Sequence, residues 1–241
     1  MLISVRQEKI LELLKANNDI SVAEIASVLH VSEPTIRRDF TELSRKGIIT
    51  KFYGGARINH IAPDSEIPFI FRENEKSSAK AEMGRKAATF VRDGMVILLD
   101  GSTSAFHIVP YLANFKDLIV VTSGAKTAIA LAEMNIRTYS TGGQMIIHSY
   151  SYIGEQAENF VRNINADLLF FSCRGLAEDG RMTDVSVEEA NLRKVLFEQS
   201  KKKILLCDDS KFGKLYFYNM GNANDADEIV SNKPLPFKIN P

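Results

Sequence analysis

The sequence has no hydrophobic segment long enough to cross a lipid bilayer. A membrane-spanning helix needs about 20 mostly apolar residues in succession, whereas the longest apolar runs here, at 95–99 and 167–171, have the length of single strands. The first ten residues, MLISVRQEKI, contain no uninterrupted apolar core and no small-residue cleavage site, so they do not resemble a signal peptide. We therefore expect a cytoplasmic protein with no membrane partner.

Cysteine and histidine are also scarce. Cys173 and Cys207, the two cysteines, lie in the apolar runs FFSC and ILLC. Such thiols are typical of reduced, buried cysteines in a cytosolic protein, although two cysteines can also pair. The four histidines have no metal-ligand spacing with one another or with the cysteines. The phosphate loop GxxxxGK and the dinucleotide motif GxGxxG are missing, and we expect neither a metal nor a cofactor.

Net charge is zero over the whole chain, with 30 basic and 30 acidic residues, but it is unevenly distributed. Residues 34–57 have an excess of basic side chains: Arg37, Arg38, Arg45, Lys46, Lys51 and Arg57 against Asp39 and Glu42. Attraction between charges is largely screened beyond about 10 Å at 0.1 M salt. A local excess of this kind is therefore what matters for contact with a phosphate backbone.

Residues 21–55 have the pattern of two short helices, a tight turn between them and a β-ribbon after them. Ser21 and Glu24 form a capping-box pattern at the start of the first helix. Its apolar positions share one face: Val22, Ile25, Ala26 and Leu29. After a turn at 30–31, Ser32 is expected to cap the second helix, with Pro34 in its first turn and Gly47 at its end.

The second of these helices has two distinct faces. Its apolar residues Ile36, Phe40 and Leu43 are expected to be buried, so that Thr35, Arg37, Arg38 and Thr41 project from the other side. A helix-turn-helix presents the start of this helix to the DNA major groove. The ribbon that follows, with strands at 48–51 and after Gly55, brings cationic and flat groups beside the DNA backbone. The alternative is that these arginines are ordinary solvent-exposed charges.

An amphipathic helix over 5–16 precedes this motif, with apolar residues Val5, Ile10, Leu13 and Leu14, and 17–19 breaks it. Residues 57–75 contain Pro63, Pro68 and a polar run, and we expect them to be irregular. We therefore divide the chain into a winged helix-turn-helix domain at 1–57, a linker at 58–75 and a second domain at 76–241.

The second domain alternates between helix and strand. We expect helices at 80–91, 105–113, 127–134, 152–163 and 186–200, and strands at 95–99, 118–121, 137–140, 167–173 and 203–207. Repeated units of this kind predict an α/β fold with a mainly parallel sheet and helices on both faces.

Polar and small residues follow five of these strands. They are DGSTS at 100–104, TSG at 122–124, GGQ at 142–144, RG at 174–175 and DDSK at 208–211. Ligands of open α/β sheets bind beyond the carboxyl ends of the strands, and main-chain amides in such loops favour an anion, here a phosphate. Alternatives remain open: Lys211 and Asp208 as a surface ion pair, Glu188, Glu189 and Lys194 as a solvated helix face, and Lys80 as an exposed charge.

The chain resembles the DeoR family of bacterial transcriptional regulators over almost its whole length. The segment VSEPTIRRDFTEL and the ribbon KFYGGA are similar to the family signature VSxxTIRRDLxxLxxxGxxxRxHGGA, with Lys51 for the usual Arg and Tyr53 for the usual His. The strand-end segments fall in family order, with DGSTS where Asp-Ser-Gly-Thr-Thr is more common and Ser123 where Asn is usual. The resemblance implies an effector domain similar to ribose-5-phosphate isomerase that binds phosphorylated sugars.

The resemblance also implies two sets of binding residues. The DNA-binding set is Ser32, Thr35, Arg37, Arg38, Lys51, Tyr53, Gly54 and Gly55. The effector-binding set is Lys80, Asp100, Gly101, Ser102, Thr103, Ser104, Thr122, Ser123, Gly143, Gln144, Arg174, Glu189 and Lys211. In the second set Ser102, Thr103 and Ser104 would hold the phosphate, Lys211 and Lys80 would add positive charge, and Asp100, Gln144 and Glu189 would contact hydroxyl groups.

We therefore expect a non-enzymatic regulator, most simply a repressor of a sugar catabolic operon, that binds duplex DNA and a sugar phosphate as a homodimer or tetramer. One alternative is a sugar-phosphate isomerase with an added helical domain, but the segment FSCRGLAEDGRMTD offers no convincing base. Another is that the second domain only dimerises and senses nothing.

Overall fold

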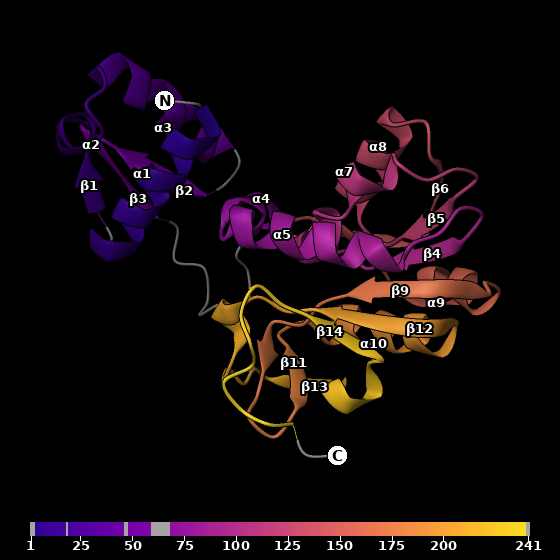
Figure 1. Cartoon of the computed structure of the whole chain (residues 1–241). Coiled ribbons are helices and arrows are strands. Elements are labelled where there is room, and N and C mark those ends of the chain that lie inside the picture. Colours follow the sequence, from indigo (N-terminus) through magenta and orange to yellow (C-terminus); the bar gives the residue numbers. More distant parts are fainter. Residues whose placement is uncertain (1–2, 18, 46–47, 59–67, 240–241) are drawn as a thin grey trace. The chain divides into compact units, whose positions relative to one another are not determined.

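The computed structural model describes residues 3–17, 19–45, 48–58 and 68–239. The chain forms two compact units, Met1–Glu75 and Lys76–Pro241, which are coloured indigo to purple and purple to yellow in Figure 1. Val5 (its side chain), Lys46, Gly47, His60 and Pro63, which entered the predictions above, lie outside the described part.

The first unit is a winged helix-turn-helix. Its elements are α1 Ile3–Asn17, β1 Asp19–Ser21, α2 Val22–Leu29, α3 Glu33–Arg45, β2 Ile49–Phe52, β3 Gly55–Ile58 and α4 Phe69–Asn74. The capping box at Ser21 and Glu24 is present as predicted, and His30, with φ of 52°, forms the left-handed turn that ends α2. The strands form an antiparallel sheet in the order β1-β3-β2.

The apolar faces predicted for this unit form its core. Ile10, Leu14, Ile25, Ile36 and Phe40 are each at most 1% exposed and belong to one cluster. Burying a side chain of this size stabilises the fold by roughly 1.5–3 kcal/mol. This burial fixes the orientation of α3, so that its opposite face lies at the surface.

The helix break expected at 17–19 is confirmed, because α1 ends at Asn17. Asp19 begins β1, a strand that was not predicted, and pairs with Arg57 of β3. One prediction for this unit is wrong. Residues 57–75 are not irregular throughout, since Phe69–Asn74 forms α4. Ile70 and Phe71 of α4 pack against the core of the first unit. The apolar run PFIF is therefore part of a helix that packing against this core stabilises. The short length of the run did not predict a helix.

The second unit is built on a six-stranded sheet in which every strand pair is parallel, in the order β14-β12-β9-β4-β5-β6. The strands of this sheet are β4 Val96–Leu99, β5 Ile119–Thr122, β6 Arg137–Ser140, β9 Ala166–Phe171, β12 Ser200–Leu206 and β14 Glu228–Val230. The chain moves outward from β4 through β5 to β6, then returns to the other side of β4 with β9. The strand order therefore switches between β4 and β9, where an open α/β sheet binds its ligands.

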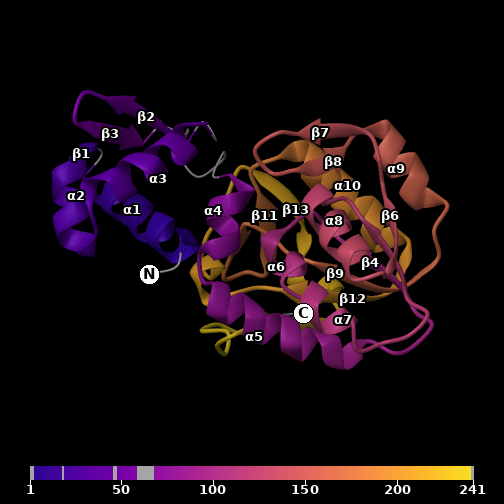
Figure 2. The same cartoon turned by 90° about the horizontal axis from the view of Figure 1, so that it is seen from above.

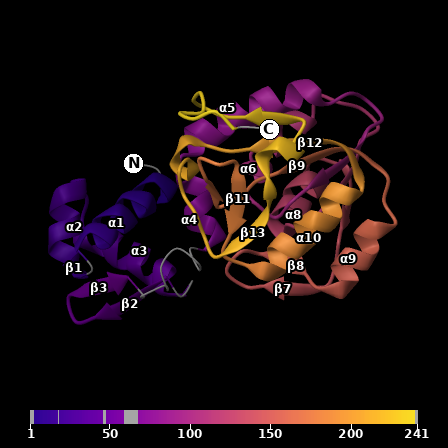
Figure 3. The ribbon, with the colours of Figure 1, turned by 90° about the horizontal axis from the view of Figure 1, so that it is seen from below.

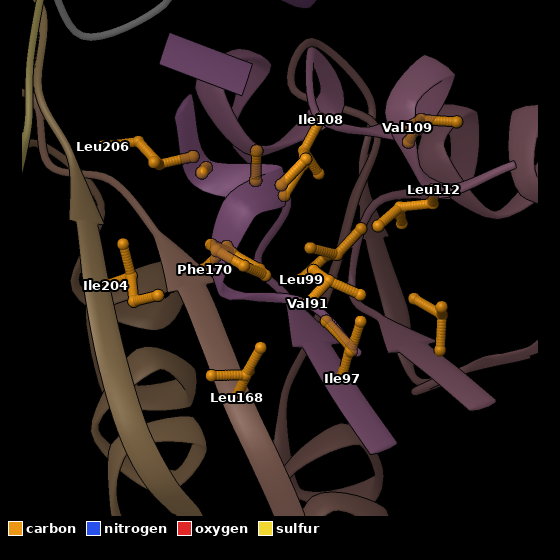
Figure 4. Packing of buried hydrophobic residues seen from close by; sticks show 14 of the residues in the cluster. Val91, Ile97, Leu99, Ile108, Val109, Leu112, Leu168, Phe170, Ile204 and Leu206 are labelled. Atoms are coloured by element: carbon orange, nitrogen blue, oxygen red, sulfur yellow. The ribbon is translucent and has the colours of Figure 1, made fainter. Parts of the chain in front are cut away.

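Helices cover both faces of this sheet, as predicted. They are α5 Ser77–Ala87, α6 Thr103–Phe106, α7 Val109–Leu112, α8 Ala125–Glu133, α9 Glu155–Arg162 and α10 Val187–Glu198. Side chains of α5, α6, α7 and α8 pack with Ile97, Leu99 and Phe170 on one face, a cluster shown in Figure 4. Side chains of α9 and α10 pack with Leu98, Leu169 and their neighbours on the other face (Figure 1).

Short strands outside the main sheet were not predicted. They are β7 Gln144–Ile146, β8 Ser151–Ile153, β10 Gly175–Leu176, β11 Arg181–Asp184 and β13 Tyr218–Asn222. β7 and β8 form an antiparallel hairpin that lies beside α10 in Figure 2. β10, β11 and β13 form an antiparallel sheet, in which β11 and β13 lie side by side in Figure 3.

Two predicted helices of this unit differ from those observed. The single helix expected at 105–113 is divided into α6 and α7, with Pro110 in the first turn of α7. Because α6 begins at Thr103, Thr103 and Ser104 lie in this helix rather than in a loop. The helix expected from Tyr152 begins only at Glu155, because Tyr152 lies in β8 and pairs with Met145.

Candidate functional sites

In the first unit, α3 and the β2–β3 hairpin form one surface. Arg37 and Arg38 are exposed on α3, and Arg37 forms an ion pair of 3.1 Å with Glu33 one turn earlier. The Nζ atom of Lys51 on β2 donates a hydrogen bond of 3.3 Å to the Thr41 hydroxyl on α3. This bond links the hairpin to the exposed side of the helix.

The hairpin tip is shaped by two glycines and presents an aromatic ring. Tyr53 is fully exposed and Phe52 is half exposed. Gly54 has φ of +83°, which favours glycine, and a side chain at Gly55 would lie only 2.6 Å from the Ile20 carbonyl oxygen. A surface hollow joins the two elements and is lined by Val22, Arg37, Phe40, Thr41, Lys51, Phe52, Tyr53, Gly54 and Gly55.

Asp39, which follows Arg38 directly in the sequence, faces away from the exposed side of α3. Asp39 is 2% exposed and accepts hydrogen bonds from Arg6 on α1, at 2.5 Å from Nε and 3.0 Å from Nη2. The hydrogen bond to Asp39 raises the pKa of Arg6, against the opposite effect of burial. The Asp39 carboxylate therefore docks α3 onto α1 and does not lie on the exposed face of α3, where Glu33 is the carboxylate that pairs with Arg37.

In the second unit, a buried charge network lies at the point where the strand order switches. Asp100, directly after β4, accepts hydrogen bonds from the main-chain amides of Ser102 and Ser172, both at 3.0 Å. It also accepts a bond of 2.9 Å from Nε of Arg193 on α10. Asp100 thereby ties the loops after β4 and β9 to one helix.

Arg193 is the centre of this network. Besides Asp100, its guanidinium contacts Asp184 at 2.6 Å and Glu189 at 3.8 Å. Only 6% of Arg193 and 1% of Asp184 are exposed. Burial alone would lower the pKa of Arg193, but attraction to Asp184, Asp100 and Glu189 outweighs it and raises that pKa above its ordinary value.

A second cluster lies where β12 ends. The Nζ atom of Lys211 donates hydrogen bonds to Ser104 at 3.0 Å and to Ser172 at 2.5 Å, and lies 3.7 Å from Asp208. Burial raises the pKa of Asp208, but attraction to Lys211, a hydrogen bond from Ser210 and attraction to Lys80 leave it below its ordinary value. Lys80 is only 4% exposed, so neither lysine is an ordinary surface charge.

A narrow crevice with a cavity volume of about 10 Å³ lies beside the Arg193 network. It is lined by Asp100, Gly101, Ser123, Ser151, Tyr152, Glu189, Leu192 and Arg193. A cavity needs about 10–15 Å³ to hold one water molecule, so this crevice has room for about one small polar group, such as a single hydroxyl. Its walls come from the loops after β4 and β5, from β8 and from α10.

Comparison with known proteins identifies both units. Residues 6–62 match the DeoR-like helix-turn-helix domain, and residues 75–233 match the DeoR C terminal sensor domain. The chain belongs to the DeoR family. It is a helix-turn-helix transcriptional regulator with a C-terminal sensor domain, and the family resemblance read from its motifs is confirmed.

Similar proteins include other DeoR-type regulators. The HTH-type transcriptional regulator GolR of Listeria innocua is 34% identical over 95% of this chain and 91% of that protein. The uncharacterized HTH-type transcriptional regulator YulB of Bacillus subtilis is 33% identical over 98% of this chain and 91% of that protein. The glycerol-3-phosphate regulon repressor of Escherichia coli is 27% identical over 97% of this chain and 92% of that protein.

Among solved structures, eIF2B delta from Chaetomium thermophilum shares the fold, with a TM-score of 0.51, 15% identity and coverage of 68% of this chain and 62% of that one. A D-ribose-5-phosphate isomerase in complex with phospho-erythronic acid matches with a TM-score of 0.44, 14% identity and coverage of 56% and 54%. The α/β class with a parallel sheet and the N-terminal winged helix-turn-helix are confirmed.

In this DeoR protein the predicted effector residues separate into groups. Asp100, Gly101, Ser123 and Glu189 line the crevice. Lys80, Ser104 and Lys211 belong to the cluster at the end of β12. Other predicted residues have local roles: the Ser102 hydroxyl caps α6, the Thr122 hydroxyl accepts a bond from the Gly124 amide, and the Arg174 amide donates to the Thr183 carbonyl.

The remaining members of the predicted set lie elsewhere. Thr103 is buried in the first turn of α6. Gln144 is exposed on β7, and a side chain at Gly143 would collide with the Ile153 carbonyl oxygen. Of the predicted DNA-contacting residues, five line one hollow: Arg37, Lys51, Tyr53, Gly54 and Gly55. Arg38 is exposed on α3 but does not line this hollow. Ser32 and Thr35 lie at the start of α3, with their hydroxyls 2.8 Å apart.

Sequence reasoning missed Arg193, Asp184, Ser151 and Tyr152. A signal existed for Arg193, because Ala190 and Leu196 lie three residues before and after it and are both fully buried, which places Arg193 on the inner face of α10. The sequence contains no comparable signal for Asp184, Ser151 or Tyr152.

Cys173 and Cys207 are buried and free, as predicted. A hydrogen bond between the two thiols lowers the pKa of Cys173 and raises that of Cys207. None of the helices in the described part is long and apolar enough to traverse a bilayer.

Proposed function

We propose that this DeoR-family protein is a repressor of a carbohydrate operon and that a phosphorylated sugar controls its affinity for operator DNA. The relatives support this in their names, which include the glycerol-3-phosphate regulon repressor and the L-fucose operon activator of Escherichia coli. These names include a repressor and an activator, and for this protein we propose repression. We also propose that the protein is cytoplasmic.

The observation that carries the DNA-binding proposal is the shared surface of α3 and the hairpin. Arg37 and Arg38 are exposed on α3, and Arg37 lines the same hollow as Lys51 and Tyr53 of the hairpin. Arginine binds guanine edges and phosphates through paired N–H donors. In this proposal α3 enters the major groove, and Lys51, Tyr53 and the amides near Gly54 contact the adjacent backbone.

The test is a double variant, Arg37→Ala with Arg38→Ala, titrated against a duplex selected by the wild-type protein from random sequences. We expect operator affinity to fall more than about 30-fold, since each arginine that contacts a base is worth roughly 1–3 kcal/mol. The matched control is Arg85→Ala with Arg162→Ala, which removes the same charge from exposed helix positions of the second unit. A double variant that binds within twofold of wild type would reject this surface.

For the effector, we propose that the loop at 100–104 with Lys211 and Lys80 holds the phosphate, and that the neighbouring crevice takes a hydroxyl group of the sugar. The Lys211 ammonium group already organises Ser104 and Ser172 through two hydrogen bonds. Asp100 then serves to position these loops and Arg193, because its two oxygens accept three bonds from the protein itself. This role replaces direct contact of Asp100 with sugar hydroxyls.

Control of DNA binding follows from linkage between the two sites. A ligand that binds one arrangement of an oligomer better than another changes operator affinity, typically by about 5–150-fold. We propose a homodimer or tetramer, because one winged helix covers one half-site and a symmetric operator needs two. Light scattering of the purified protein, with and without operator duplex, measures this directly, and a monomer on DNA would contradict it.

We propose further that the protein is not an isomerase. Two of the three acidic residues of the segment at 171–184 are held in ion pairs, Asp179 with Arg181 and Asp184 with Arg193. An isomerase needs a positioned base. Incubation with ribose 5-phosphate is expected to yield no ketose above background, and measurable turnover would favour the enzyme.

A sensing role is separated from a purely dimerising role by thermal shift against sugar phosphates. A ligand present at 100 times its dissociation constant stabilises the folded state by about 2.7 kcal/mol. We expect at least one member of a panel of glycerol 3-phosphate, ribose 5-phosphate, glucose 6-phosphate and fructose 1-phosphate to raise the melting temperature. The same compound should weaken operator binding.

A further inference from the structure

Three hydroxyl groups in the described part of the chain are buried without a hydrogen-bond partner: those of Thr127, Ser149 and Ser151. Buried polar groups in folded proteins nearly always have a partner, because an unpaired one costs free energy. Such a hydroxyl therefore needs a physical reason, and a ligand that completes the bond is one such reason.

Ser151 differs from the other two because it lines the crevice. It lies on β8 and is 2% exposed. Its main chain is fixed on both sides, by pairing with Ile146 of β7 and by an antiparallel bridge to Gly124. The main chain that carries the Ser151 hydroxyl is therefore held in one place before any ligand arrives.

The opposite wall of the crevice leaves room for this hydroxyl. A side chain at Gly101 would collide with the Ser151 Oγ atom, so the space beside Ser151 depends on a glycine at that position. Ser123 also lines this part of the crevice. Its main-chain carbonyl accepts a hydrogen bond of 2.7 Å from the Tyr152 amide, which fixes the loop after β5 against β8.

The charge beside Ser151 indicates which part of a ligand fits there. Three carboxylates, those of Asp100, Asp184 and Glu189, surround the single guanidinium of Arg193. The excess of negative charge disfavours a phosphate in the crevice. The cations that would attract a phosphate, Lys211 and Lys80, lie instead beside Asp208 at the end of β12.

We propose that the Ser151 hydroxyl binds a hydroxyl group on the sugar part of the phosphorylated ligand and thereby selects among sugars. A serine hydroxyl both donates and accepts, so it matches a sugar hydroxyl and completes its own missing bond. This inference rests on the proposed function, since it assumes that a sugar phosphate occupies the second unit. It adds a residue outside the motifs that first identified the site.

The test compares Ser151→Ala with Ser149→Ala. Ser149 is the matched control, because it is also 2% exposed and unpartnered but does not line the crevice. Calorimetric titration uses the member of the sugar-phosphate panel that most stabilises the wild-type protein, and inorganic phosphate serves as a second probe. Thermal unfolding without ligand is measured for all three proteins.

We expect Ser151→Ala to bind the sugar phosphate about 5–10-fold more weakly, as for loss of one hydrogen bond. Its affinity for inorganic phosphate should stay within twofold of wild type. Its melting temperature without ligand should equal or exceed that of wild type, because the substitution removes an unpaired polar group. Ser149→Ala should keep wild-type affinity for both probes.

Two results would overturn the proposal while leaving the proposed function intact. One is sugar-phosphate affinity of Ser151→Ala within twofold of wild type. The other is a ligand-free Ser151→Ala that melts below Ser149→Ala, which would assign the hydroxyl a structural bond, for example to a buried water. If no sugar phosphate stabilises wild type, the proposed function itself fails and this inference with it.

Discussion

Arginine has opposite surroundings at the two candidate sites. On α3, Arg37 and Arg38 lie exposed at the surface, and the one ion pair of Arg37 with Glu33 is itself exposed. In the second unit, Arg193 is buried and contacts three carboxylates. An exposed guanidinium remains available to a macromolecular partner, whereas a buried one is committed to holding a site together. Charge alone therefore does not distinguish a contact residue from a positioning residue, and burial does.

The largest effect expected from this comparison follows Arg193→Met. The change leaves Asp100 and Asp184 buried without their cation, which typically costs about 3–5 kcal/mol. Urea unfolding monitored by circular dichroism measures the loss. Arg181→Met is the control, because its ion pair with Asp179 is exposed and such pairs are worth about 0–1 kcal/mol. Similar losses for the two variants would show that the buried network contributes no special stability.

A smaller effect is expected for Lys211→Met, which removes the hydrogen bonds to Ser104 and Ser172. We expect a loss of about 1–3 kcal/mol in unfolding free energy and no thermal shift with the sugar phosphate that stabilises wild type. Operator affinity without ligand should not change. Lys201→Met, at a largely exposed lysine paired with Asp167, is the control. A full thermal shift in Lys211→Met would remove Lys211 from the effector site.

Tyr53→Ala tests the exposed side of the comparison. Because Tyr53 is fully exposed, the melting temperature should not change, while operator affinity should fall about 2–10-fold through loss of one contact. Phe217→Ala, at a ring that is 83% exposed in the second unit, should leave both quantities unchanged. Wild-type operator affinity in Tyr53→Ala would exclude the hairpin tip from DNA contact.

The smallest effect concerns pH and the partly buried carboxylate of Asp209. A hydrogen bond from Lys233, with further help from Asn232 and Lys76, lowers the pKa of Asp209 to about 2. Since the folded-state pKa lies below the unfolded value, this group stabilises the fold above about pH 4. That contribution is lost as the pH falls from about 4 to about 2. Solvent screening limits it to less than about 1 kcal/mol.

Asp209→Asn should therefore lose less stability than wild type when urea unfolding at pH 5 is compared with unfolding at pH 3. Asp179→Asn, in an exposed two-residue turn, provides a second carboxylate with a lowered pKa for comparison. An identical pH dependence of wild type and Asp209→Asn would show that Asp209 does not contribute.

Much of the first unit was predictable because its signals are local. The capping box at Ser21, the apolar face of α3 and the glycines of the hairpin each determine structure within a few residues. In the second unit the alternation of buried strands and helices predicted the parallel sheet for the same reason. β1 and α4 were not predicted because each depends on partners that are distant in the sequence. β1 pairs with β3, and α4 packs against the core cluster that contains Ile10.

The effector site was only partly predictable. Strand-end motifs identified Asp100, Gly101 and Ser123, which do line the crevice, since the carboxyl ends of parallel strands converge. Glu189, on α10, also lines it and was expected only from the family resemblance. The motifs did not separate these residues from Lys211 and Ser104, which form a different cluster. The sequence did not identify Ser151, because the β7–β8 hairpin has no periodic pattern of apolar residues. The place of Ser151 in the crevice is set by its pairing with Gly124.

The Asp100 carboxylate has a consequence for how such a sensor acquires new specificities. It joins the loops after β4 and β9 to α10, so neither Asp100 nor Arg193 can be exchanged without cost to the fold. Ser123, Ser151, Tyr152 and Leu192 share the same crevice but lie outside that network. Divergence toward a different metabolite, in nature or in the design of a biosensor, therefore has these four positions as its starting points.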